Sequence, residues 1–230
     1  MPGKMSLFRR KSAHNLATEV SGLRLNNPVG MLLPAETPAA FCRKAKTGFL
    51  TLQLPQTNIL SWIAQLSRRK AESTRLAVNL STGIPRHFAL TYDFADLLII
   101  DPDPSGGIGS PDVSDILSLM DSLLNLRLCY ERFTPVYIRL PQGISTEELE
   151  PILHYCQMSG VDGVVAPGLR MVSQIVGSTK GRLPVMGSTA EILEAREMLR
   201  AGASLVELSS RGLPVLKFLK SLENNNLSQI

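Results

Sequence analysis

The chain has 230 residues, of which 44% are hydrophobic and 19% are charged. This length is enough for one large α/β domain with a sizeable core, and the composition is typical of soluble globular proteins. Part of the net charge of +4 comes from Lys4, Arg9, Arg10 and Lys11. We interpret residues 1–15 as a basic, solvated tail. The other basic residues are dispersed and aromatic residues are few, so the sequence does not indicate a nucleic-acid-binding protein.

The sequence contains no apolar segment of the length that a secretory signal or a membrane span needs. Its three cysteines, Cys42, Cys129 and Cys156, lack the spacing of metal ligands. We expect them to be buried free thiols, as in proteins of a reducing compartment. These observations predict a cytoplasmic protein with no metal site.

Short apolar runs alternate with segments of helical period along the whole chain. The runs lack polar alternation, which is typical of parallel strands that are covered on both faces. Eight strands are predicted: Val29–Leu33, Phe49–Leu54, Leu76–Leu80, Leu97–Ile100, Val136–Leu140, Gly163–Ala166, Leu183–Met186 and Ser204–Leu208. The segment 85–93 allows only a short helix in the third unit.

Helix start and stop signals support this alternation. N-terminal caps are expected at Asn58, Ser110, Ser145 and Ser188, with Pro111 in a first helical turn. Glu148 and Glu191 give the last two caps the spacing of a capping box. Gly202 is a predicted left-handed C-terminal residue. The last helix is expected to bury four apolar side chains: Val215, Phe218, Leu219 and Leu222.

The chain shows eight strand–helix units, and its composition does not change along the sequence as it would between two domains. This pattern predicts a closed (β/α)8 TIM barrel over residues 16–223, with a short tail at 224–230. An open, doubly wound sheet would show the same alternation, so periodicity alone leaves both architectures open.

A specific resemblance enters at residues 21–30, which read SGLRLNNPVG. This segment resembles the opening of dihydroorotate dehydrogenases, where a small hairpin plugs the barrel floor and leads into the first strand. Later segments similar to that family are Gly48–Phe49, Leu76–Leu80, Ala95–Ile100, Pro135–Arg139, Val161–Val165 and Arg200–Leu208. The resemblance covers residues 20–223. It implies a TIM barrel, FMN as cofactor and a relation to pyrimidine biosynthesis.

The chain departs from this family's pattern where the first four strands end. The family's Ala-Ala-Gly, where the flavin ring packs, is Leu32-Leu33-Pro34 here, and Thr37 stands at the position of the following lysine. The Gly-Thr after strand two becomes Gln53-Leu54, and the substrate-binding loop that follows is missing. The family's catalytic base after strand four corresponds to Pro104, which cannot accept a proton. A shift of one residue would place Asp103 or Ser105 there.

The later strands depart from the pattern as well. The flavin-contacting lysine of strand five is replaced by Arg139, whereas Asn79 keeps a family-like amide. After strand six the family's loop gives way to Pro167-Gly168. The phosphate-binding glycines after strand seven are replaced around Ser188 and Thr189, and strand eight is followed by the shortened stretch Ser209-Ser210-Arg211-Gly212.

Two groups of residues are candidates for a binding site. Ser188, Thr189, Ser209 and Ser210 lie where such barrels bind phosphate, although helix capping explains them equally well. Arg139 could bind a phosphate or a carboxylate, but an ion pair with Asp101 or Asp103 is the favoured interpretation. No histidine lies at a strand end, so no Ser–His–Asp arrangement is expected.

Three hypotheses for function follow. The leading one is a degenerate dihydroorotate dehydrogenase-like barrel without cofactor, which serves as a binding or regulatory module and forms a homodimer or pairs with another protein. The rival is an active FMN-dependent oxidoreductase with an altered substrate. Its reduced flavin site would use Asn79, Arg139, Ser188, Thr189, Ser209 and Ser210. The third is a flavin-free barrel that binds a small anionic ligand, such as a phosphorylated metabolite.

Overall fold

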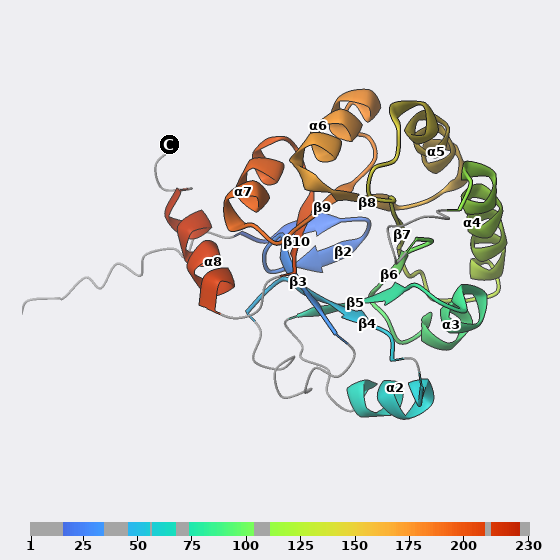
Figure 1. The fold of residues 1–230 in the computed structure, drawn as a ribbon. Coiled ribbons are helices and arrows are strands. Elements are labelled where there is room, and N and C mark those ends of the chain that lie inside the picture. The colour runs from blue at the N-terminus through green and yellow to red at the C-terminus, as the bar shows by residue number, and fades with distance from the viewer. Residues whose placement is uncertain are drawn as a thin grey trace, which may run out of the picture.

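The computed structural model describes residues 16–34, 46–55, 57–67, 74–103, 111–209 and 213–225. Eight parallel strands close into a barrel in the order β10-β3-β4-β5-β6-β7-β8-β9 (Figure 1). Their bounds are β3 Val29–Leu33, β4 Phe49–Gln53, β5 Arg75–Leu80, β6 Leu97–Ile100, β7 Val136–Arg139, β8 Gly163–Pro167, β9 Val185–Thr189 and β10 Leu205–Leu208. The predicted TIM barrel is confirmed, and the open sheet is not the fold.

The described helices form an outer ring around the barrel (Figure 1). They are α2 Ile59–Ser67, α3 Ile84–Thr91, α4 Val113–Arg127, α5 Thr146–Ser159, α6 Gly168–Thr179, α7 Ile192–Arg200 and α8 Leu213–Asn225. Each helix returns the chain from the C-terminal end of one strand towards the N-terminal end of the next. Helix N-termini therefore gather around the C-terminal mouth of the barrel. No helix among these residues is long and apolar enough to cross a membrane.

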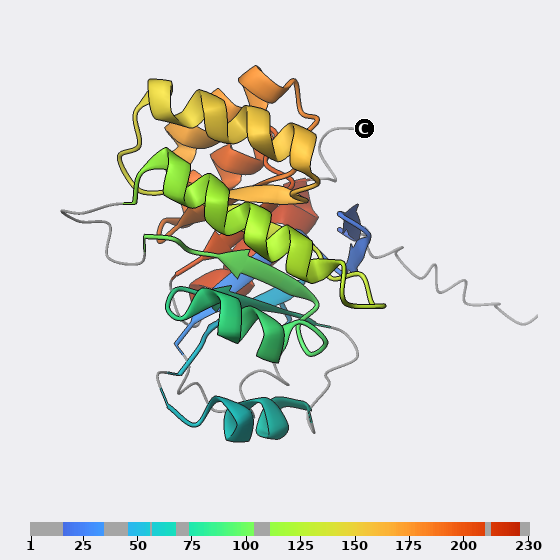
Figure 2. The same cartoon turned by 90° about the vertical axis from the view of Figure 1, so that its right-hand side faces the viewer.

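The predicted hairpin is present at the opposite end, the floor of the barrel. Strands β1 (Thr18–Val20) and β2 (Leu23–Leu25) pair in antiparallel register, and Figure 2 shows them beyond one end of the barrel. Val20 and Leu25 join the apolar cluster inside the barrel. The hydroxyl of Ser21 contacts the Tyr137 hydroxyl at 2.9 Å and donates to the carbonyl of Asp162, also at 2.9 Å. The hairpin thus plugs the N-terminal ends of the strands.

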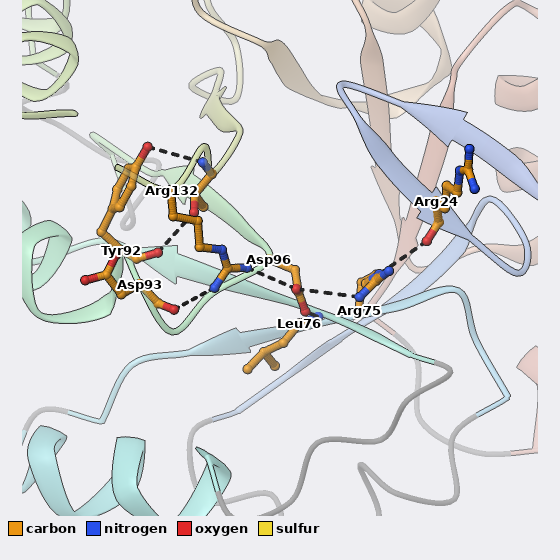
Figure 3. A network of polar contacts seen from close by, with 8 residues as sticks. Arg24, Arg75, Leu76, Tyr92, Asp93, Asp96 and Arg132 are labelled. Carbon is orange, nitrogen blue, oxygen red and sulfur yellow. Dashed lines mark hydrogen bonds and ion pairs between the residues drawn. The ribbon is translucent and has the colours of Figure 1, made fainter. Parts of the chain in front are cut away.

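A second set of polar contacts closes the floor beside the hairpin (Figure 3). The carboxylate of Asp96 accepts the backbone N–H of Leu76 and forms ion pairs with Arg75 and Arg132 at 3.9 and 3.3 Å. Arg132 also donates to the carbonyl of Asp93, and Arg75 donates to that of Arg24 in the hairpin. Asp96 therefore ties together the loops that precede β5, β6 and β7.

The structure corrects several sequence-based expectations about local structure. β9 extends through Thr189, so Ser188 lies within a strand and the predicted Ser188–Glu191 capping box is wrong; Glu191 itself is the N-cap. α4 begins only at Val113, after Asp112, which leaves Pro111 outside the helix. The Ser145–Glu148 capping box is confirmed. Gly202 has the predicted positive φ, 101°.

The expectations for the cysteines and the end segments are confirmed only in part. Cys156 is buried as predicted, but Cys129 is exposed because it follows the last turn of α4. Cys42 lies outside the described residues, as do residues 1–15, which the sequence predicts to be a tail. The predicted apolar face of α8 is confirmed at Val215, Phe218 and Leu219, which are buried.

Candidate functional site at the barrel mouth

The side chains that point into the barrel change character along its axis. Towards the floor they are apolar and pack in one cluster: Phe49, Ala77, Leu97, Tyr137, Met186 and Leu205. Towards the mouth the inward positions of the same strands carry polar groups: Thr51, Asn79, Arg139, Ser188 and Glu207. Alternation along each strand produces this arrangement, since every second residue faces inward. The polar half lies at the end where barrels of this type form their sites.

The strand register sorts these inward residues into layers. Following it around the barrel places Thr51, Ile99, Val165 and Glu207, from alternate strands, at one height. The other four strands contribute the layer above, towards the mouth: Leu32, Asn79, Arg139 and Ser188. The mouth is thus built from one half-apolar layer beneath one predominantly polar layer.

Arg139 is the centre of a buried network in the upper layer. Its Nη2 donates to Oε1 of Glu207 at 2.9 Å, and its Nη1 faces the Ser188 hydroxyl at 3.4 Å. Its Nε donates to Oδ1 of Asn79 at 3.3 Å and lies 3.5 Å from Oδ2 of Asp101. All three nitrogen atoms of the guanidinium therefore face groups of the chain itself.

The partners of Arg139 are also joined to one another. Asn79 donates from its amide nitrogen to Oδ2 of Asp101 at 3.1 Å, and Ser188 donates to Oε1 of Glu207, also at 3.1 Å. The favoured interpretation of Arg139 as a member of an ion pair with Asp101 is confirmed. The Glu207 pair was not predicted, and it is the shorter of the two.

Burial governs the ionisation of this network. It is the main influence raising the pKa of Asp101, and the hydrogen bond from Asn79 and the charge of Arg139 only partly oppose it. Burial alone would lower the pKa of Arg139, but the carboxylates of Glu207 and Asp101 more than offset this effect. Arg139 consequently stays charged, and its charge is neutralised inside the barrel.

Two buried polar atoms in the lower layer have no hydrogen-bond partner. They are Oγ1 of Thr51 and Oε2 of Glu207. Neither residue has any exposed surface. Unpaired buried polar atoms are uncommon in folded proteins, and each calls for a physical explanation.

Thr189 belongs to a different environment from Ser188, because consecutive residues of β9 point to opposite faces. Its hydroxyl accepts the backbone N–H of Glu191 and donates to the carboxylate of Glu194 on α7. The other oxygen of that carboxylate accepts the backbone N–H of Leu169 at 2.9 Å, in the first turn of α6. A helix N-terminus favours an anion, and at α6 this anion is Glu194 of the chain itself.

The remaining candidates do not join either cluster. Ser209 is exposed, and its hydroxyl reaches only the carbonyl of Thr189 at 3.5 Å. Asp103 is half-buried, and its charge raises the pKa of Asp101. Pro104, Ser105 and Ser210 lie outside the described residues. Of the two leucines at the family's flavin-ring position, Leu32 faces inward, whereas Leu33 packs in the layer between barrel and helices.

Sequence reasoning missed Glu207, Glu194 and Thr51. A signal for Glu207 existed, since it is the one charged residue within the apolar strand 205–208. Glu194 looked like an ordinary first-turn acid, and Thr51 like an ordinary strand residue. No group of three or more His, Cys, Asp or Glu residues within the described part of the chain is arranged to hold a metal ion.

Comparison with solved structures agrees with this architecture. The structure is similar to dihydroorotate dehydrogenase from Eimeria tenella, with a TM-score of 0.76 and 19% identity, over 94% of this chain and 85% of that chain. It is also similar to the flavin-binding domain of baker's yeast flavocytochrome b2, with a TM-score of 0.59 and 14% identity, over 84% and 59% of the two chains.

A third similar structure is the glycerol uptake operon antiterminator regulatory protein of Listeria monocytogenes. Its TM-score is 0.52 at 14% identity, over 80% of this chain and 94% of that chain. No protein-family model matches the sequence, and no curated protein sequence matches it. At these identities the likeness establishes the shared barrel fold, with FMN-dependent enzymes among its neighbours, and leaves function to the site.

Proposed function

We propose that this protein is a flavin-free, non-catalytic barrel of the dihydroorotate dehydrogenase type that acts as a binding or regulatory module. The observation that carries the proposal is that the chain's own groups hold Arg139 in place. Each of the three nitrogens of its guanidinium already faces Asn79, Asp101, Ser188 or Glu207, so the side chain is not turned towards a flavin.

The residues near the phosphate position support the same conclusion. A flavin phosphate would need free N–H groups at a helix N-terminus. After β9 the Thr189 hydroxyl takes the N–H of Glu191, which precedes α7, and donates to the carboxylate of Glu194. A second anion beside Glu194 would be repelled. The described residues therefore do not fit FMN, and we derive no reaction step through it.

Two further observations support a non-catalytic role. Leu32 faces into the mouth where an isoalloxazine ring would need a gap. A similar barrel occurs in the Listeria protein, which is described as an antiterminator regulatory protein. The binding partner of the present chain would be a protein or a second copy of the chain.

The test is a flavin titration of purified protein. We expect colourless protein that takes up no FMN, releases no flavin on heating and does not oxidise dihydroorotate with an artificial electron acceptor. The Arg139→Lys variant restores the family's lysine. It should remain colourless, because Glu194 and Leu32 still oppose the cofactor. Yellow wild-type protein with near-stoichiometric flavin would contradict the proposal.

A further inference from the structure

Among the described residues, carboxylates outnumber basic side chains at the mouth of the barrel. Helix first turns contribute Asp115 on α4, Glu147 and Glu148 on α5, and Glu194 on α7. Asp101 and Glu207 add two more at the strand ends, and Arg139 is the only basic side chain in their network. Acidic residues in first helical turns complement the helix dipole, so this ring of carboxylates around the mouth does not by itself define a site.

The unpaired atoms inside the barrel add an independent observation. Oγ1 of Thr51 and Oε2 of Glu207 lie in the same layer, on strands that flank β3. β3 contributes no side chain beneath them, because its inward residue there is Gly30. The carboxylate oxygen can only accept a hydrogen bond, whereas the hydroxyl can donate one and accept others. Glu207 Oε2 therefore lacks a donor, and Thr51 Oγ1 lacks a partner of either kind.

The side chain above this pair is Leu32, the only apolar member of the upper layer. It lies on β3, between the strands of Thr51 and Glu207, and it is half-buried. The upper layer borders solvent, since 17% of the side chain of Arg139 remains exposed. Leu32 thus lies between the mouth and the two unpaired atoms.

We propose that the barrel mouth binds a small cationic hydrogen-bond donor, of the primary amine class, between Thr51 and Glu207 beneath Leu32. This inference rests on the proposed flavin-free function. An ammonium group would supply the donors that Thr51 Oγ1 and Glu207 Oε2 lack and would balance the excess negative charge. An anion would instead meet Glu207, Asp101 and a guanidinium that is already neutralised.

The experiment is calorimetric titration of the full chain with the diamine putrescine and, in parallel, with inorganic phosphate. We expect one-to-one binding of putrescine that weakens with added salt, and no binding of phosphate. Glu207→Gln and Thr51→Val should each weaken putrescine binding about tenfold, because each removes one acceptor. Leu32→Ala should tighten it. Glu150→Gln, at an exposed carboxylate of α5, should leave it unchanged.

Several outcomes would overturn this inference. One is an absence of putrescine binding by both the wild type and Leu32→Ala. A second is binding of phosphate. A third is putrescine binding that is weakened by Glu150→Gln but not by Thr51→Val, which would indicate diffuse attraction to exposed carboxylates. Thr51→Val keeps the test valid if Glu207→Gln does not fold. A parallel FMN titration separates the two proposals, since FMN uptake contradicts the proposed function itself.

Discussion

The guanidinium of Arg139, on β7, donates a 2.9 Å hydrogen bond to the carboxylate of Glu207, on β10, inside the barrel. Four strands along the barrel wall separate the two residues on one side and two on the other. The side chain of Glu207 is fully buried. A charge in that position is tolerated only with a partner, so the pair couples two distant strands of the mouth.

Removing one member of this pair should destabilise the barrel strongly. We expect Arg139→Leu to lower the free energy of unfolding by about 3–5 kcal/mol, because Glu207 is left as an unpaired buried charge. The double variant Arg139→Leu/Glu207→Leu should lose less than the sum of the two single changes. Urea denaturation of the four proteins gives this cycle. Arg200→Ala, in an exposed pair with Glu197, should cost less than about 1 kcal/mol.

The raised pKa of Asp101 predicts a pH dependence of stability. Burial raises this pKa above its ordinary value, so the folded state favours the protonated form. The protonated side chain of Asp101 therefore contributes to the free energy of unfolding. This contribution is fully present below the pKa of the unfolded state, about 3.9, and is lost as the pH rises through the pKa of the folded state. Relative to Asp101→Asn, the wild type should therefore become less stable as the pH rises from 3 towards neutrality, measured by urea denaturation across that range.

The matched control for Asp101 is Glu150→Gln, which removes a carboxylate from an exposed position. The difference in unfolding free energy between Glu150→Gln and the wild type should not show the pH dependence that is expected for Asp101→Asn. If wild type and Asp101→Asn instead keep a constant difference in unfolding free energy over the whole range, burial does not control the ionisation of this group.

The segment that carries the family resemblance should prove structural. Oδ1 of Asn27 accepts the N–H groups of Val29 and Gly48, and its amide donates to the carbonyl of Lys46. Asn27 is buried. We expect Asn27→Ala to lower the unfolding free energy by about 2–3 kcal/mol, because it leaves buried backbone groups without partners.

The control for Asn27 is Arg24→Ala in the same hairpin. Arg24 forms an exposed pair with Glu19, so its loss should cost less than about 1 kcal/mol. Equal effects of the two variants in urea denaturation would contradict a clamping role for Asn27. The glycine of the same motif, Gly30, is also structural, since a Cβ there would meet the ring of Phe49 at 2.1 Å.

Much of the fold could be predicted from the sequence, because hydrophobic period is a local property. Strand bounds at Val29–Leu33 and Leu97–Ile100 were predicted correctly from apolar runs. The predicted bounds are wrong at β9, because the polar residues Ser188 and Thr189 belong to the strand. Their hydrogen bonds to Glu207 and Glu194 come from distant segments, and local patterning does not contain that information.

The candidate site was predicted only in part. Position at strand ends identified Asn79, Arg139 and Ser188, because the mouth of a barrel follows from its topology. The sequence could not show whether Arg139 binds a ligand or pairs with a carboxylate, because that depends on which side chains meet inside the barrel. Glu207 completes the network from a strand 68 residues away along the chain.

The sequence by itself thus predicted the barrel, its floor hairpin and the end at which polar side chains gather. Eight strand–helix units and the family resemblance together indicated the barrel, and the resemblance of residues 21–30 indicated the hairpin. Tertiary structure decided what those side chains do. Only the closed register places Glu207 against Arg139, Glu194 at the start of α6 and Gly30 beneath two unpaired acceptors. Charge pairing and burial arise from contacts across the barrel, and local patterns along the chain do not encode them individually.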